Sequence, residues 1–137
     1  MILLDTNVIL DVWDRDPVWH AWSRDQMRKL SRLYDLTINP IIYAEVSARY
    51  STLASLDEHL DQLGIIIEGI SREAAFLAGK AYSRYRSRGG IQSNVLPDFF
   101  IGAHATVLRC PLVTRDTRRY SAYFPTVQLI TPQPGLC

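Results

Sequence analysis

Short apolar runs alternate along this chain with longer segments in which apolar residues recur at helical spacing. The short runs are β-branched or leucine-rich and have the length of buried strands. The predicted strands cover residues 2–4, 36–38, 65–67, 111–114 and 127–130. This alternation predicts an α/β fold with a central, mostly parallel sheet of about five strands, flanked by helices on both faces.

Capping residues set the expected boundaries of the helices. Asp16 and Asn39 each precede a proline, which suits the first turn of a helix because its missing amide would have no partner there. Ser71 can cap a long helix, and Gly64 can end the one before it. The expected helices cover residues 17–33, 41–50, 53–63, 71–87 and 99–108, with shorter helical segments after Asp5 and Asp116.

Composition is that of a globular protein. The 137 residues suit a single domain over positions 1–137, with 47% hydrophobic and 21% charged residues. No apolar run approaches the ~18 residues that span a membrane. Asp5 interrupts the N-terminal apolar run, so we expect a cytoplasmic protein with no membrane partner. Cys110 and Cys137 form neither a disulfide framework nor a zinc pattern.

Charge is distributed unevenly between the two halves of the chain. Residues 1–70 carry 11 acidic and 6 basic side chains, a net charge of −5, whereas residues 71–137 carry 3 and 9, a net charge of +6. A basic half indicates a polyanionic partner. The alternative is a mixed-charge surface once the chain has folded.

Four acidic residues occupy comparable places beside the predicted elements. Asp5 and Asp116 follow strands, Glu45 lies early in the helix after the second strand, and Asp98 opens a helix. The carboxyl ends of parallel strands share one edge, so all four side chains can meet there. Clustered carboxylates repel each other, and Mg²⁺ or Mn²⁺ relieves this because hard cations prefer oxygen ligands. One or two such ions suit phosphodiester hydrolysis, in which they activate water and stabilise the leaving oxygen.

Each acid also has a purely structural interpretation. Asp5 can cap a helix, Asp98 can favour a helix dipole and Asp116 can lie in a turn. Glu45 can form a surface ion pair with Arg49, four residues later. Four separate structural roles at one edge of one sheet explain the pattern less well than one shared site.

An ordered set of motifs resembles the PIN-domain ribonucleases, and most closely the VapC toxins of prokaryotic toxin–antitoxin pairs. The matching pieces are Leu4-Asp5-Thr6-Asn7-Val8, Pro40 followed by Glu45, Leu96-Pro97-Asp98 with Ile101 and Ala103, Val113-Thr114-Arg115-Asp116, and Tyr123-Phe124-Pro125-Thr126-Val127 leading to Thr131-Pro132. They span nearly the whole chain in the order and at the spacing of the family.

The resemblance implies a three-layer PIN-like fold and a metal-dependent endoribonuclease that cleaves structured RNA with Mg²⁺ or Mn²⁺. Its catalytic and metal-binding residues are Asp5, Glu45, Asp98 and Asp116, and its supporting residues are Thr6, Asn7 and Thr114. The family is also typically dimeric and inhibited by a VapB-like antitoxin.

We expect RNA to lie along the basic half of the chain. The candidate RNA-binding residues are Arg88, Arg115 and Arg118, because the planar fork of arginine can bond two phosphate oxygens. Arg119 also flanks Asp116, and Arg84 and Arg86 precede Arg88.

Three other interpretations remain open. A solitary PIN-domain nuclease of RNA processing would carry the same four acids. A phosphotransfer domain would use Asp5 as its nucleophile, although haloacid-dehalogenase-type phosphatases need a second aspartate where this chain has Asn7. A catalytically silent α/β binding module would use the acids only as caps. Metal dependence distinguishes the ribonuclease from the silent module, and a trapped phospho-aspartate would favour phosphotransfer.

Overall fold

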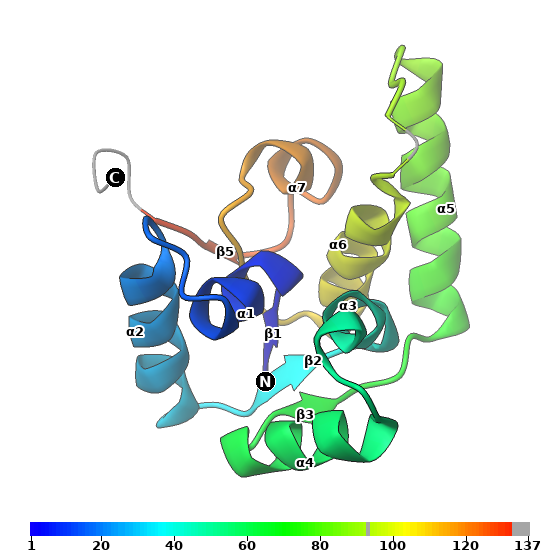
Figure 1. The fold of residues 1–137 in the computed structure, drawn as a ribbon. Helices are drawn as coiled ribbons and strands as arrows, with labels where there is room; N and C mark the ends of the chain where they lie inside the picture. The colour runs from blue at the N-terminus through cyan, green and yellow to red at the C-terminus, as the bar shows by residue number, and fades with distance from the viewer. Residues whose placement is uncertain (93, 133–137) are drawn as a thin grey trace.

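Strands and helices alternate in the computed structural model, which describes residues 1–92 and 94–132 (Figure 1). Cys137 lies outside the described residues. In chain order the elements are β1 (Ile2–Leu4), α1 (Thr6–Trp13), α2 (His20–Ser31), β2 (Leu36–Ile38), α3 (Pro40–Val46), the 3-10 turn η1 (Ser47–Arg49), α4 (Leu53–Leu63), β3 (Ile66–Ile67), α5 (Arg72–Ser87), α6 (Leu96–Leu108), β4 (Leu112–Val113), α7 (Arg118–Tyr123) and β5 (Leu129–Ile130).

The sheet is entirely parallel and has the strand order β3-β2-β1-β4-β5. Leu3 in the central strand β1 is paired with Thr37 of β2 on one side and Leu112 of β4 on the other. The chain therefore builds outward from β1 in both directions, and β1 marks a topological switch point. Ligands of open α/β sheets bind beyond the carboxyl end of such a strand. The predicted parallel α/β fold of about five strands is confirmed.

The core forms around β1 because helices cover the sheet. Ile2, Leu3 and Leu4 are all at most 1% exposed, as expected for a strand buried on both faces. Helix α6 contributes a further buried stripe. A Cβ atom on its Gly102 would overlap the ring of Phe124, the residue that follows α7, so only glycine allows these two elements to approach so closely.

Both boundaries predicted for α2 differ from the observed ones. Helix α2 begins at His20 rather than at residue 17, because Asp16 Oδ1 accepts hydrogen bonds from the amides of Val18 and Trp19 (both 2.8 Å) and forms a turn first. Leu33 lies beyond the end of α2 and is 71% exposed. Gly64 ends α4 in the left-handed conformation (φ 69°), as predicted.

None of the helices in the part of the chain that the structure describes has the length and apolar character needed to cross a membrane.

Candidate active site

The four predicted acids lie together at the carboxyl edge of the sheet. Asp5 directly follows β1, Glu45 lies in α3, Asp98 lies in the first turn of α6, and Asp116 lies between β4 and α7. Together with Thr6, Asn7 and Leu10 they line a cleft of about 240 Å³. The fold thus gathers side chains that are up to 111 positions apart in the sequence, and it does so at the switch point.

Asp5 is the most deeply buried of the four, at 4% exposure. Its Oδ1 accepts a hydrogen bond from the Thr6 amide (2.7 Å) at the start of α1. Burial raises the pKa of Asp5 to about 7, and the nearby charge of Asp98 acts in the same direction. Asp5 is therefore a helix cap whose charged form is costly in this buried position.

Two hydroxyl groups fix the other oxygen of Asp5. Thr114 Oγ1 donates to Asp5 Oδ2 at 2.7 Å, and Tyr120 OH donates to the same atom at 3.0 Å. Thr114 Oγ1 also accepts a hydrogen bond from the Asp116 amide (3.0 Å), so one side chain orients two of the acids. Tyr120 is fully buried, and its role at the site was not predicted. Its position four residues after Asp116 is the only sequence signal that places it beside the acids.

The remaining supporting residues connect α1 to its neighbours. Thr6 Oγ1 donates to Glu45 Oε1 (2.6 Å), which ties the exposed side chain of Glu45 in α3 to the start of α1. Asn7 Nδ2 donates to Asp5 Oδ2 (3.4 Å), and its Oδ1 accepts from the Arg115 amide (3.4 Å). The structure therefore places all three predicted supporting residues against the acids or the backbone beside them.

Arg49 does not pair with Glu45. Its Nε donates to Asp14 Oδ1 (3.0 Å), and its Nη2 donates to Asp14 Oδ2 (2.5 Å). The purely structural interpretation of Glu45 as the surface partner of Arg49 is therefore wrong, because Glu45 contacts Thr6 instead.

Arg119 adds a cation to the acid cluster. Its Nη1 donates to Asp98 Oδ2 (2.5 Å) and lies 3.6 Å from Asp116 Oδ2. Burial raises the pKa of Asp98, and the charge of Arg119 opposes this rise. The sequence identified Arg119 only as one of several arginines near Asp116, because its contact with a residue 21 positions away depends on how α6 and α7 pack.

The donor chemistry of the cleft fits a hard divalent cation. The four acids offer only oxygen ligands, which Mg²⁺ and Mn²⁺ prefer. Their side chains are not gathered for coordination as they stand: within residues 1–92 and 94–132, no three acidic, histidine or cysteine side chains are close enough to hold one ion. Asp98 is instead turned to Arg119, and Asp5 to its hydroxyl partners. The metal-binding roles of the acids therefore stay a prediction.

Two of the predicted RNA-binding arginines are available at the surface. Arg88, at the end of α5, is exposed, with its guanidinium carbon 5.7 Å from the centre of the Tyr123 ring. Arg118, the first residue of α7, is also exposed. Both side chains are exposed to solvent, and their role in RNA binding stays a prediction.

Arg115 is engaged within the fold. Its Nε and Nη2 donate to the two carboxylate oxygens of Asp11 (2.8 and 2.9 Å), and its guanidinium lies over the ring of Trp19. Asp11 is only 3% exposed, so the pair neutralises a buried charge and ties α1 to the segment after β4. A role of Arg115 in RNA binding stays a prediction beside this structural one.

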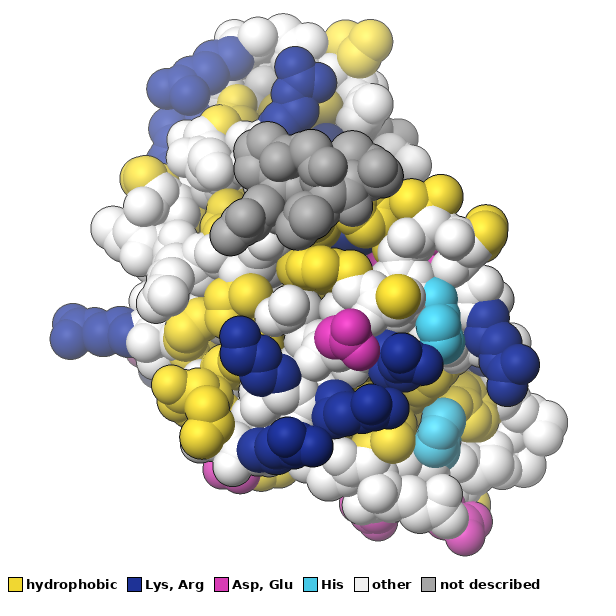
Figure 2. All heavy atoms as spheres, turned by 90° about the vertical axis from the view of Figure 1, so that its left-hand side faces the viewer, with side chains coloured by type: hydrophobic (Ala, Val, Ile, Leu, Met, Phe, Trp, Pro, Cys, Tyr) yellow, Lys and Arg dark blue, Asp and Glu magenta, His cyan; other side chains and the backbone are white. Residues whose placement is uncertain are grey.

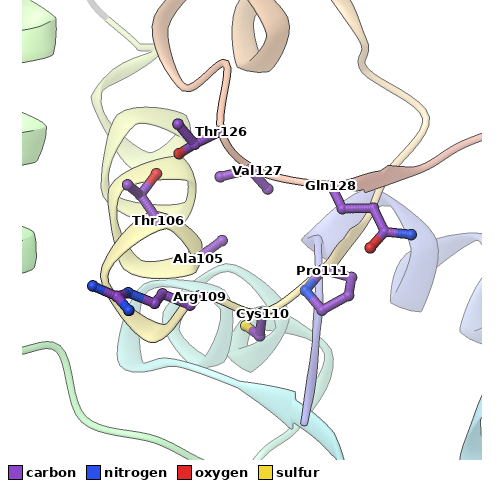
Figure 3. A pocket seen from close by; sticks show the side chains of 8 residues that line it. All are labelled: Ala105, Thr106, Arg109, Cys110, Pro111, Thr126, Val127 and Gln128. Atoms are coloured by element: carbon purple, nitrogen blue, oxygen red, sulfur yellow. The ribbon is translucent and has the colours of Figure 1, made fainter.

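A larger cavity lies away from the acids. It has a volume of about 580 Å³ and is formed by the end of α6 and the residues just before β4 and β5 (Figure 3). Its lining residues are Ala105, Thr106, Arg109, Cys110, Pro111, Thr126, Val127 and Gln128. No carboxylate lines it, so the small acidic cleft, and not the larger cavity, is the candidate active site.

This α/β fold with a carboxylate cleft at its switch point corresponds to a known family. The PIN domain model matches residues 2–125, and the chain belongs to the PIN domain family. The predicted family resemblance is confirmed. A search of curated proteins gave no significant match.

The fold is also that of several solved structures. A chain in the structure of VapBC2 from Rickettsia felis, bound to a DNA fragment from their promoter, is 21% identical with a TM-score of 0.73, over 97% of this chain and 100% of that one. A chain of VapBC-1 from nontypeable Haemophilus influenzae is 20% identical with a TM-score of 0.69, over 96% and 98%. A chain of FitAcB from Neisseria gonorrhoeae is 24% identical with a TM-score of 0.59, over 96% and 97%. At these identities the similarity shows the shared fold.

Proposed function

We propose that this protein is a Mg²⁺- or Mn²⁺-dependent endoribonuclease, the toxin of a VapBC-type toxin–antitoxin pair. The observation that carries the proposal is the convergence of Asp5, Glu45, Asp98 and Asp116 in one cleft of a PIN domain. The fold similarity to chains from VapBC complexes supports the toxin assignment. A solitary PIN-domain nuclease of RNA processing is the alternative, because it would use the same acids.

The residues of the cleft have two proposed roles, which are to hold the cation and to orient the acids. Asp5, Glu45, Asp98 and Asp116 would hold the cation, which supplies Lewis acidity and an activated water for hydrolysis. Thr114 and Tyr120 fix the orientation of Asp5, and Thr6 fixes that of Glu45. These hydrogen bonds limit the orientations that the carboxylates of Asp5 and Glu45 can adopt.

Substrate binding is proposed to use the exposed arginines beside the cleft. Arg88 directly follows α5 and Arg118 begins α7, and both can form bidentate contacts with phosphate. Arg115 also belongs to the proposed RNA surface, although its guanidinium is held by Asp11. Structured RNA with an accessible unpaired segment is the proposed substrate class, and its binding should weaken as salt increases.

A VapB-like antitoxin is the proposed protein partner. A groove of about 200 Å³ between α1, α2 and α4 is lined by Val12, Met27, Leu36 and Leu63, with Arg24 and Arg28 also in its lining. On the side of the molecule where α2 lies, several Lys and Arg side chains gather beside apolar ones (Figure 2). This groove, which we call the α2–α4 groove, suits an amphipathic helix with acidic residues at its edges.

A homodimer is the proposed assembly. Ile66 and Ile67 on the edge strand β3 and Phe76 on α5 are at least 43% exposed, and a second copy of the chain would remove such apolar surface from water.

The nuclease proposal is tested with partner-free protein and structured cellular RNA, in Mg²⁺ or in EDTA. We expect discrete cleavage products from the wild type in Mg²⁺ only. Asp5→Asn and Asp98→Asn should each lower the rate by a factor on the order of 10² or more, because each removes a proposed metal ligand.

Asp25→Asn is the matched control for the nuclease experiment, since Asp25 is an exposed acid on α2 with the same chemistry and should leave the rate unchanged. Cleavage that persists in EDTA, or wild-type rates from Asp5→Asn, would contradict the proposal. Trapping of a phospho-aspartate at Asp5 would favour phosphotransfer instead.

A further inference from the structure

A guanidinium lies between two of the four acids in the cleft. Arg119 Nη1 donates to Asp98 Oδ2 and lies 3.6 Å from Asp116 Oδ2. Its Nη2 donates to Gln92 Oε1 (3.2 Å), and the guanidinium carbon lies 6.0 Å from the centre of the Tyr85 ring. Contacts with α5, α6 and the segment between them thus hold a side chain that is only 20% exposed.

Arg119 and a divalent cation would need the same carboxylates. Two cations a few ångström apart repel each other, and the repulsion is strong where burial lowers the dielectric. Asp98 is 30% exposed, so water screens this repulsion only in part. The guanidinium also draws Asp98 toward α7, which accords with the observation that no three acids among the described residues are gathered around one point.

We propose that Arg119 is a built-in competitor of the catalytic metal. Without metal, its guanidinium neutralises Asp98 and Asp116; a divalent cation binds in the cleft only as the guanidinium leaves Asp98. This inference rests on the proposed metal-dependent function of the same site. Competition from Arg119 makes the metal-free protein bind a divalent cation more weakly than the four acids would without it. Activity therefore depends on the concentration of free metal.

The neighbouring residue offers a matched control. Arg118 carries the same charge on the same helix, its side chain is exposed, and it makes no ion pair within the described part of the chain. Arg118→Ala therefore changes the net charge near the cleft without releasing Asp98. Arg119→Lys keeps the charge but loses the fork that reaches Asp98 and Gln92 together.

The test is a calorimetric titration of Mn²⁺ into partner-free wild type and the three variants at one pH and salt concentration. We expect Arg119→Ala to bind Mn²⁺ about tenfold more tightly than the wild type, Arg118→Ala to change the Kd by less than about threefold, and Arg119→Lys to fall between them. An Arg119→Ala affinity equal to that of Arg118→Ala, or weaker than that of the wild type, would overturn the competition.

A second measurement on the wild-type chain covers the case in which Arg119→Ala does not fold. Mg²⁺ is diamagnetic, so NMR can follow the arginine Nε–H signals during its addition. We expect the Arg119 signal to shift as the guanidinium leaves Asp98, while that of Arg115, paired with Asp11, stays in place. An unmoved Arg119 signal at saturating Mg²⁺ would overturn the proposal.

The two experiments separate this inference from the function on which it rests. If neither the wild type nor any variant binds Mn²⁺ or Mg²⁺, the proposed metal-dependent function fails and the competition fails with it. If the wild type binds metal but Arg119→Ala binds it no more tightly, only the competition fails.

Discussion

Asp5 shows how a single residue serves both the fold and the site. Its Oδ1 caps α1 through the Thr6 amide, while its Oδ2 is held by Thr114 and Tyr120. The sequence predicted the cap and the site as alternatives, and the structure shows the cap together with a place in the acidic cleft. The contact with Tyr120 could not be predicted, because it depends on the packing of α7 against the end of β1.

The raised pKa of Asp5 predicts how stability depends on pH without metal. The folded protein holds the proton up to a pKa of about 7, whereas the unfolded chain releases it near 3.8. Asp5 therefore stabilises the fold below about pH 4, and this contribution is lost as the pH rises through 7. The pKa difference is worth on the order of 4 kcal/mol across this range.

Thermal unfolding in EDTA between pH 4 and 8 measures the contribution of Asp5 to the pH dependence of stability. Asp5→Asn should lack this part of the pH dependence and should be more stable than the wild type at pH 8. Mg²⁺ at pH 8 should stabilise the wild type but not the variant. A variant less stable than the wild type at pH 8 in EDTA would contradict the assigned cost of this buried charge.

At the scale of elements, the boundaries that follow from local chemistry were predicted well. Gly64 ends α4 and Ser71 caps α5, because each acts within its own turn. The start of α2 was predicted at residue 17, but the Asp16 side chain stabilises a turn there instead. The approach of α6 to the end of α7 was not predicted, because periodicity does not tell which elements meet.

Gly102 provides a test of that approach. Alanine at this position would place a methyl group into the ring of Phe124, which is 3% exposed and cannot move freely. We expect Gly102→Ala to lower the free energy of unfolding by about 1–3 kcal/mol, as overpacked cores do, even though alanine favours helix.

Urea unfolding measures the effect of Gly102→Ala. Gly79→Ala in α5 is the control, because nothing lies within 4 Å of a Cβ atom there, and it should raise stability by about 0.5–1 kcal/mol. An equal rise in the free energy of unfolding for both variants would show that the Phe124 ring can move aside without destabilising the fold.

For the whole molecule, the alternation of apolar runs and helical segments was sufficient to predict the parallel sheet. The same alternation brought Asp5, Glu45, Asp98 and Asp116 to one edge. It did not reveal that Arg115 pairs with Asp11 or that Arg119 pairs with Asp98, since both contacts join segments distant in sequence. Charge counts predicted basic surface but not which arginines the fold itself uses.

The proposed partner surface is also a property of the whole molecule, because three helices build the α2–α4 groove. Leu63→Lys places a charge in its apolar lining and should weaken binding of an acidic amphipathic helix about tenfold or more. Leu53→Lys is the control, since Leu53 lies on the same helix, is 70% exposed and does not line the groove. Fluorescence anisotropy of a labelled antitoxin segment measures both, and equal affinities would rule out this groove.

The parallel pairing of β1 with β4 has a consequence for the order of events during synthesis. β1 is made before both of its neighbours and can pair with β2 first, but it gains its second neighbour, β4, only when residues 112–113 have been made. The Thr114 hydroxyl that donates to Asp5 is made directly after β4. Asp116 follows two residues later. A chain extended only through α6 therefore carries Asp5, Glu45 and Asp98 without the strand that completes their edge. If the protein has the proposed function, the nascent chain cannot cleave RNA near the ribosome until β4, Thr114 and Asp116 have been made and the sheet can form.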